Sequence, residues 1–218
     1  MPRTANPAIR TALIDAAARL LADEGPASLT LRRLTSEVGT STMAVYTHFG
    51  GMDELVRAVR VDGFARLADH LGSVPRTDDP VADLAALGVA YFLNAVTNPN
   101  LYRVMFGHFA DDESDVGLET FVTLSDGVAR CIEARRFRRA DATEVATQVW
   151  AMSHGVVTLQ IAGFLGPAEA LQTFSELGGN LMRALGDKPA TLDASWAVVA
   201  QRAAEDSRLQ TFLTAPAG

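Results

Sequence analysis

The fold of this chain is decided by residues 29–55, which read LTLRRLTSEVGTSTMAVYTHFGGMDEL. Thr30 is a residue type that caps helices well, and the residues after it place their apolar side chains on one face. The sequence therefore predicts a short helix over 31–38. Gly39 ends that helix, because glycine readily adopts the backbone conformation that closes a helix C-terminus. A tight turn at Thr40-Ser41 separates this helix from the next one.

A second short helix is expected from about residue 42 to residue 48. A pair of glycines then breaks the chain before a longer helix over about 53–70. An earlier helix opens at Asn6-Pro7, a favourable cap followed by a favourable first-turn residue, and stops at Gly25. Two short helices joined by a tight turn, with a longer helix on each side, form a helix-turn-helix.

The second short helix has the outline that a DNA-reading helix needs. Val45 and, one turn later, Phe49 occupy its inward positions. The major groove of DNA is about 12 Å wide, so a helix inserted into it must be slim and polar on its outer edge. The outward positions carry small or hydrogen-bonding side chains: Thr42, Met43, Ala44 and Thr47.

The whole run resembles the N-terminal signature of the TetR family of bacterial transcriptional regulators. That signature ties the helix-turn-helix to an aromatic Y-x-H-F run at fixed spacing, here Tyr46-Thr47-His48-Phe49, and the match covers residues 9–60 without a gap. The resemblance implies phosphate contacts, which set the register on the duplex, and contacts to base edges. The implied phosphate contacts are Thr30, Thr40, Tyr46 and His48. The implied base contacts are Thr42, Met43 and Thr47, with Ala44 on the same edge, and Arg32 reaches a base or a phosphate.

Two positions depart from the family pattern. Met52 stands where family members usually have a lysine that clamps a phosphate, and Thr42 often corresponds to a basic or polar residue. Each lost phosphate contact flattens the salt dependence of DNA binding, by about 0.9 in slope. A simpler interpretation also exists for several residues. Phe49 is expected to be a core aromatic, Tyr46 to pack its ring while its hydroxyl reaches a phosphate, and Arg32 and Arg33 could be solvated surface charges.

Helical periodicity dominates the rest of the chain, and no region alternates like a strand. The sequence predicts an all-α fold, with an N-terminal three-helix helix-turn-helix domain and a larger helical domain for ligand binding and dimerisation. Further helices are expected at about 81–97, 99–109, 114–136, 141–164 and 168–185, and one amphipathic helix at about 193–213. The predicted division is a DNA-binding domain over 1–52, a connecting helix over 53–72, an effector-binding and dimerisation domain over 73–188, and a C-terminal helix and tail over 189–218.

The C-terminal part resembles a TetR-family subgroup marked by a Trp-x-x-x-His-Gly motif, here Trp150 to Gly155. A run over 99–107 also resembles that subgroup. Aromatic and thioether side chains with a few polar groups suit a small, largely apolar effector, although each of them could instead fill an ordinary helical core. The candidate effector-binding residues are Phe92, Tyr102, Met105, Phe106, Phe109, Phe121, Trp150, His154 and Thr158.

The resemblance also implies a homodimer on a palindromic DNA operator, most often as a repressor, because doubling one helix-turn-helix supplies affinity and specificity. The family packs its last two main helices, here about 143–164 and 168–185, into a four-helix bundle with the partner. Small residues in this region would permit close approach: Ala146, Ala151, Gly155, Ala162, Gly178 and Gly179.

Composition and charge are compatible with this interpretation. Hydrophobic residues make up 48% of the chain and charged residues 21%, and the net charge of −7 resides entirely after residue 72. The single cysteine, Cys131, cannot form an intramolecular disulfide, so a reducing cytoplasm is expected. The N-terminus does not read as a signal peptide. The segment 145–165 comes closest to a membrane span, but polar residues interrupt it, and no membrane association is expected.

Two other classes of function compete with this interpretation. An enzyme is disfavoured because the four histidines form no metal-binding or nucleophile–base pattern, so no catalytic residue, metal or cofactor is expected. A helical protein-interaction module that has lost DNA binding stays open, because Met52 replaces the lysine and the N-terminal part is neutral. The basic run Arg135-Arg136-Phe137-Arg138-Arg139 is interpreted as solvated surface at a junction between helices.

Overall fold

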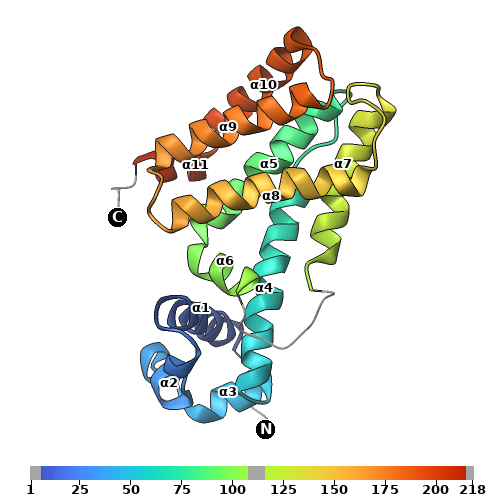
Figure 1. Ribbon diagram of the computed structural model, residues 1–218. Helices are drawn as coiled ribbons and strands as arrows, with labels where there is room; N and C mark the ends of the chain where they lie inside the picture. The colour runs from blue at the N-terminus through green and yellow to red at the C-terminus, as the bar shows by residue number, and fades with distance from the viewer. Residues whose placement is uncertain (1–5, 108–115, 215–218) are drawn as a thin grey trace. The chain divides into compact units, whose positions relative to one another are not determined.

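The computed structural model describes residues 6–107 and 116–214, and in these ranges it contains helices and no strand (Figure 1). The all-α prediction is therefore confirmed. The helices are α1 (Pro7–Glu24), α2 (Leu31–Val38), α3 (Thr42–Phe49), α4 (Met52–Gly72), α5 (Pro80–Thr97), α6 (Pro99–Phe106), α7 (Leu118–Glu133), α8 (Ala142–Ile161), α9 (Pro167–Ala184), α10 (Pro189–Ala204) and α11 (Ser207–Thr214). A short 3-10 turn, Pro26–Ser28, follows α1.

The chain divides into two compact units. The N-terminal unit runs to Arg66 and resumes over Asn98–Leu118, so it holds α1, α2, α3, most of α4, and α6. The C-terminal unit comprises Leu67–Thr97 and the chain from Glu119 onward. Packing thus groups α6 with the helix-turn-helix, whereas the functional boundaries expected from the sequence follow the chain order and stay a prediction.

The N-terminal unit is organised around α1. Asn6 accepts a hydrogen bond from the backbone N–H of Ala8 and so caps α1, and Leu13, Ile14 and Leu20 are fully or almost fully buried. This core also takes in Leu34 of α2, Val45 of α3, Leu55 and Val59 of α4, and Leu101 and Val104 of α6. Burying these apolar side chains removes their surface from water and holds the two short helices in place.

In the C-terminal unit, α8 and α9 pack against each other, and α5 packs against α8, α10 and α11. The buried core joins residues of α5, α7, α8, α9 and α10, and it includes Cys131, whose thiol is fully buried. Gly178 and Gly179 lie on the face of α9 that packs against α10. A Cβ built on Gly178 would lie 3.2 Å from the Trp196 ring. These two glycines therefore permit a helix contact inside one chain. Contrary to the expectation from the sequence, Gly178, Gly179 and the buried Ala146 do not lie on an exposed face that a partner chain could contact.

Helix α5 is the one described helix that is long and apolar enough to cross a membrane by length and composition. The sequence alone instead predicts that the segment 145–165 comes closest to a membrane span. In the structure, 67% of α5 is buried inside the protein. A buried core helix of a folded domain can meet the same criteria of length and hydropathy as a membrane span.

The segment before α5 is anchored by ion pairs. The Arg136 guanidinium donates to both carboxylate oxygens of Asp187 at 2.7 Å and to Asp79 at 3.0 Å. Arg130 donates to Asp83 at 2.8 Å and to the carbonyl of Thr77 at 2.7 Å. The segment between α4 and α5 is thus tied to the end of α7 and to the connection between α9 and α10.

The C-terminal segment differs from the expected single helix over 193–213. It forms two helices, because Asp206 accepts the backbone N–H of Arg208 at 2.8 Å and starts a new helix at Ser207. The apolar pattern continues through both helices, with Val199 of α10 and Phe212 of α11 buried, so periodicity alone did not reveal the break.

Candidate nucleic-acid interface and effector cluster

Helix α3 has a buried side and an exposed edge. Val45 is fully buried, while Met43 is 67% exposed and Tyr46 is 50% exposed. Thr42 and Thr47 are also exposed, whereas Ala44 is half-buried and packs against the core. The exposed edge of α3 therefore consists of Thr42, Met43, Tyr46 and Thr47.

The N-terminus of α3 offers a residue that the sequence did not single out. Ser41 occupies the capping position, is exposed, and makes no side-chain cap hydrogen bond. Its hydroxyl and the first backbone N–H groups of α3 are the kind of donors that bind phosphate at a helix N-terminus. The hydroxyl of Thr47, in contrast, donates to the carbonyl of Met43 at 2.7 Å, so its remaining capacity is as an acceptor.

Helix α2 separates its two arginines. Arg33 is bound to Glu24, with one guanidinium–carboxylate distance of 2.6 Å, and also lies 3.7 Å from Glu37. Arg32 is exposed and forms no ion pair with any described residue. Arg32 is therefore the arginine of this pair whose charge is available to an anion, while Arg33 braces α2 against α1.

Thr30 and Thr40 flank α2. The Thr30 side chain accepts the backbone N–H of Arg33 at 3.3 Å and so caps α2, as the sequence predicts. Thr40 is half-buried, and its backbone N–H donates to the carbonyl of Thr35 at 2.9 Å. A shallow hollow of about 390 Å³ lies along the exposed side of α2 and is lined by Thr30, Arg32, Arg33, Ser36 and Glu37.

The end of α3 is packed. Phe49 is half-buried, its ring lies 6.1 Å from the His48 ring, and the Arg10 guanidinium sits 5.5 Å from its centroid. His48 is half-buried in the last turn of α3. Met52 begins α4 and packs against the N-terminal core. The position of the usual lysine thus holds an apolar side chain.

The C-terminal unit brings together three of the expected effector residues. The rings of Phe121 and Trp150 lie 6.2 Å apart, and those of Trp150 and His154 lie 5.9 Å apart. Tyr91, which the sequence did not single out, places its hydroxyl 3.3 Å from Nδ1 of His154. Burial lowers the pKa of the His154 imidazole, so the ring is neutral near pH 7 and has one donor and one acceptor nitrogen. We refer to Tyr91, Phe121, Trp150 and His154 as the effector cluster, after the role that the sequence predicts for the last three.

The other expected effector residues lie elsewhere. Phe92 is fully buried, with its ring 5.4 Å from Phe174 and 5.4 Å from Phe212, so it fills the core of the C-terminal unit. Thr158 is exposed on α8. Tyr102, Met105 and Phe106 belong to α6 in the N-terminal unit, where the Tyr102 and Phe106 rings lie 4.9 Å apart. Phe109 lies outside the described residues.

Comparison with known proteins identifies the family. Residues 13–59 match the sequence model described as "Bacterial regulatory proteins, tetR family", and residues 84–180 match "Tetracyclin repressor-like, C-terminal domain". The chain belongs to the TetR family of bacterial transcriptional regulators. The resemblance noted from the sequence is thereby confirmed, while membership of the Trp-His-Gly subgroup stays a prediction.

Relatives of this TetR-family chain are described as HTH-type transcriptional regulators. The HTH-type transcriptional regulator Rv1816 of Mycobacterium tuberculosis is 31% identical over 158 residues, which cover 67% of this chain and 66% of the relative. An uncharacterized HTH-type transcriptional regulator of the same species, Rv0681, is 25% identical over 77% of both chains. The family and these relatives are transcriptional regulators, not enzymes.

Solved structures share the fold. The TetR family transcriptional regulator PfmR from Thermus thermophilus is 20% identical, with a TM-score of 0.66 over 78% of this chain and 97% of that one. A gamma-butyrolactone receptor, an ArpA-like protein, is 20% identical, with a TM-score of 0.68 over 94% of this chain and 98% of that one. Among the described residues, no group of three or more histidine, cysteine or acidic side chains is placed to hold a metal ion.

Proposed function

We propose that this TetR-family chain is a repressor that binds a palindromic operator as a homodimer and is released by a small, largely apolar effector. The observation that carries the DNA-binding part is the exposed edge of α3. Its side chains project from a helix whose opposite face, at Val45, is fully buried in the core. A helix braced in this way can be inserted into a major groove without losing its shape.

Each candidate residue then has a role. Tyr46, His48, Thr30 and Thr40 contact phosphates and set the register. Thr42, Met43 and Thr47 face base edges, and Ala44 lies beside them on the same side of α3. Arg32 contacts a base or a phosphate through its unpaired charge, and Ser41 adds a hydroxyl at the N-terminus of α3.

The homodimer is proposed to form through the helices over about 143–164 and 168–185. Ala151 and Gly155 of α8, and Ala162 directly after it, are small exposed residues spaced by one or two helical turns. A Cβ built on Gly155 would meet nothing within 4 Å, so this stripe is open to a partner helix. Leu159 of α8 and Leu177 of α9 add exposed apolar surface. A two-fold interface would bury the same patch on both copies.

The effector cluster supports a ligand that is mainly apolar and carries one polar group. Phe121 and Trp150 supply aromatic surface, and the neutral Tyr91–His154 pair supplies hydrogen-bonding groups without a net charge. A neighbour with the same fold is a gamma-butyrolactone receptor, so this fold serves at least one small ligand of that chemistry. Effector binding is proposed to act through α4, which contributes residues to both units, and to change the separation of the two α3 helices in the dimer.

Footprinting on the DNA upstream of the chain's own gene tests the DNA-binding part. Protection of two half-sites is expected at low salt. Arg32→Gln removes an unpaired cation and should weaken specific binding by about 1–3 kcal/mol, which is about 5- to 150-fold. Arg202→Gln, an exposed arginine on α10, serves as the control and should leave binding unchanged. Absence of protection at low salt would favour the protein-interaction module instead.

Sedimentation of matched variants tests the dimer. Ala151→Arg places a charge in the small-residue stripe of α8 and is expected to give a folded monomer. Ala197→Arg places the same charge on exposed α10 and should leave the protein dimeric. Equal sedimentation of the two variants would show that the interface lies elsewhere.

A further inference from the structure

Helix α3 and the chain on both sides of it lack permanent positive charge. Between Arg33 and Arg57 the sequence contains no lysine or arginine. Helix α4 opens with Met52, Asp53 and Glu54, so its first turn is acidic. Affinity for DNA depends strongly on cations that neutralise phosphates and release their counterions. A cation beside α3 therefore has to come from another part of the fold.

Arg10 of α1 brings such a cation to the end of α3. Its guanidinium lies 5.5 Å from the centroid of the Phe49 ring, and the His48 ring lies 6.1 Å from the same ring. Arg10 is exposed and forms no ion pair with any described residue. A guanidinium held over an aromatic face keeps N–H groups free to donate to an anion. The charge of Arg10 is thus both positioned and available.

The Phe49 ring places this charge on the side of α3 that carries Tyr46. Residues three apart on a helix are neighbours on its surface, and Tyr46 is 50% exposed. Phosphates border the major groove on both sides, so a cation on the flank of an inserted helix meets the DNA backbone and not a base edge. Arg10 and Tyr46 can therefore contact the same stretch of backbone.

The stability of the fold does not account for a cation at position 10. Arg10 is the fourth residue of α1, close to the positive end of the helix dipole, where a positive charge is unfavourable. An exposed cation–π contact is of about the same size as that cost, so the two nearly cancel. Arg19, the other arginine of α1, is instead paired with Glu37.

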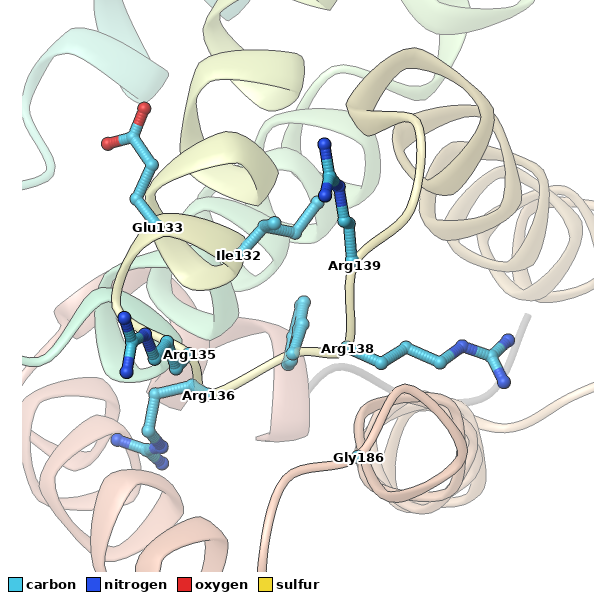
Figure 2. Close-up of a pocket in the computed structure, with 8 residues that line it drawn as sticks. Ile132, Glu133, Arg135, Arg136, Arg138, Arg139 and Gly186 are labelled. Carbon is cyan, nitrogen blue, oxygen red and sulfur yellow. The ribbon is translucent and has the colours of Figure 1, made fainter.

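The exposed arginines of the turn between α7 and α8 show no comparable arrangement. Arg135, Arg138 and Arg139 line an open hollow of about 560 Å³, but Figure 2 shows Arg135 and Arg138 extending to opposite sides of the turn. Their charges do not converge on one site, which agrees with the solvated surface expected from the sequence. Arg10 differs because its charge lies against a helix that carries other candidate phosphate contacts.

We propose that Arg10 contacts a DNA phosphate beside Tyr46 and supplies the cation that Met52 does not. This inference rests on the proposed DNA-binding function. Phe49 is then a positioning residue, because its ring holds the guanidinium at the flank of α3.

The salt dependence of DNA binding by the full chain tests this contact. The probes are two duplexes of equal length, one from upstream of the chain's own gene and one of mixed sequence. Arg10→Gln should weaken binding to both duplexes by a similar factor. The slope of the logarithm of the binding constant against the logarithm of salt concentration should become shallower by about 0.9, the value for one phosphate contact. Arg10→Lys keeps the charge and should keep the slope.

Two further variants separate contact from general charge and test the positioning role. Arg19→Gln removes the same charge from the same helix and should keep the wild-type slope, because Glu37 neutralises Arg19. In a Phe49→Leu background, Arg10→Gln should weaken DNA binding by a smaller factor than in the wild type. Equal melting temperatures of the wild type and Arg10→Gln show that the loss of binding does not reflect unfolding.

Several results would overturn the proposal. A wild-type slope in Arg10→Gln would remove the phosphate contact and leave the DNA-binding function intact. Weakening confined to the upstream duplex, with an unchanged slope, would make Arg10 a base contact. An equal loss of slope in Arg19→Gln would indicate only general attraction to charge. Failure of the wild-type protein to bind either duplex at low salt would overturn the DNA-binding function together with this contact.

Discussion

Position 52 combines a structural role with a missing charge. Met52 packs against the N-terminal core at the start of α4, where the TetR pattern places a phosphate-clamping lysine. Met52→Lys is expected to restore one phosphate contact, because a lysine stem can lie along the same apolar surface while its ammonium group reaches solvent. The logarithm of the DNA-binding constant, measured against the logarithm of salt concentration, should steepen by about 0.9.

The control for this change keeps the apolar packing without adding a charge. Met52→Leu should bind DNA with the wild-type salt slope. If Met52→Lys also kept the wild-type slope, position 52 would lie away from the phosphate backbone, and the family role would not transfer to this chain.

Single residues show where sequence reasoning succeeds and where it stops. The inward position of Val45 and the cap at Thr30 follow from local periodicity and local hydrogen bonding, and both are confirmed. Gly178 could not be placed, because a small residue allows a close approach equally well to a partner chain or to Trp196 of the same chain. Tyr91 was missed because its contact with His154 joins residues 63 positions apart.

At the scale of elements, the contact between α4 and α6 depends on Gly63. A Cβ built on this glycine would lie 2.6 Å from Cγ of Met105. Alanine favours a helix over glycine by about 1 kcal/mol, but overpacking costs about 1–3 kcal/mol. Gly63→Ala is therefore expected to lower the free energy of unfolding in the wild type and to raise it or leave it unchanged in a Met105→Ala background. Denaturant unfolding of the four proteins measures this coupling.

The decisive result is whether the effect of Gly63→Ala on the free energy of unfolding differs between the wild-type and Met105→Ala backgrounds. If Gly63→Ala had the same effect in both backgrounds, Met105 would not pack against Gly63 and the close crossing of α4 and α6 would be absent. Gly72→Ala provides a reference, because a Cβ at that exposed glycine meets nothing within 4 Å.

Element boundaries followed the sequence where a cap was explicit, as at Asn6, Thr30 and Gly39. The break between α10 and α11 was missed because its capping residue, Asp206, lies within an apolar pattern that continues on both sides. The grouping of α6 with the helix-turn-helix was also not foreseeable. This grouping depends on which helices, distant in sequence, pack over Leu101 and Val104. The order of the helices along the chain does not reveal those partners.

At the scale of the whole molecule, acid should destabilise the protein in two stages. Burial lowers the pKa of His154 below its ordinary value, so the unfolded chain takes up a proton more readily than the native one as pH falls below about 6.5. For Asp79 and Asp83, burial opposes ionisation, but hydrogen bonds from Ser195 and from the backbone N–H of Thr77, with Arg136 and Arg130 nearby, lower both pKa values on balance. Their contribution is present above about pH 4 and is lost as pH falls further.

Thermal melting measured from pH 8 to pH 3 separates the two stages. The wild-type melting temperature should decline first as pH falls through about 6.5 and again below about 4. His154→Gln should remove the first decline and keep the second, whereas His70→Gln should keep both. Because neutral His154 is one of the two polar groups of the proposed effector cluster, the affinity for an apolar effector should fall over the same first interval. If His154→Gln still lost stability between pH 7 and pH 5, another group would be responsible for the first decline. The pH dependence of stability would then give no information on the effector cluster.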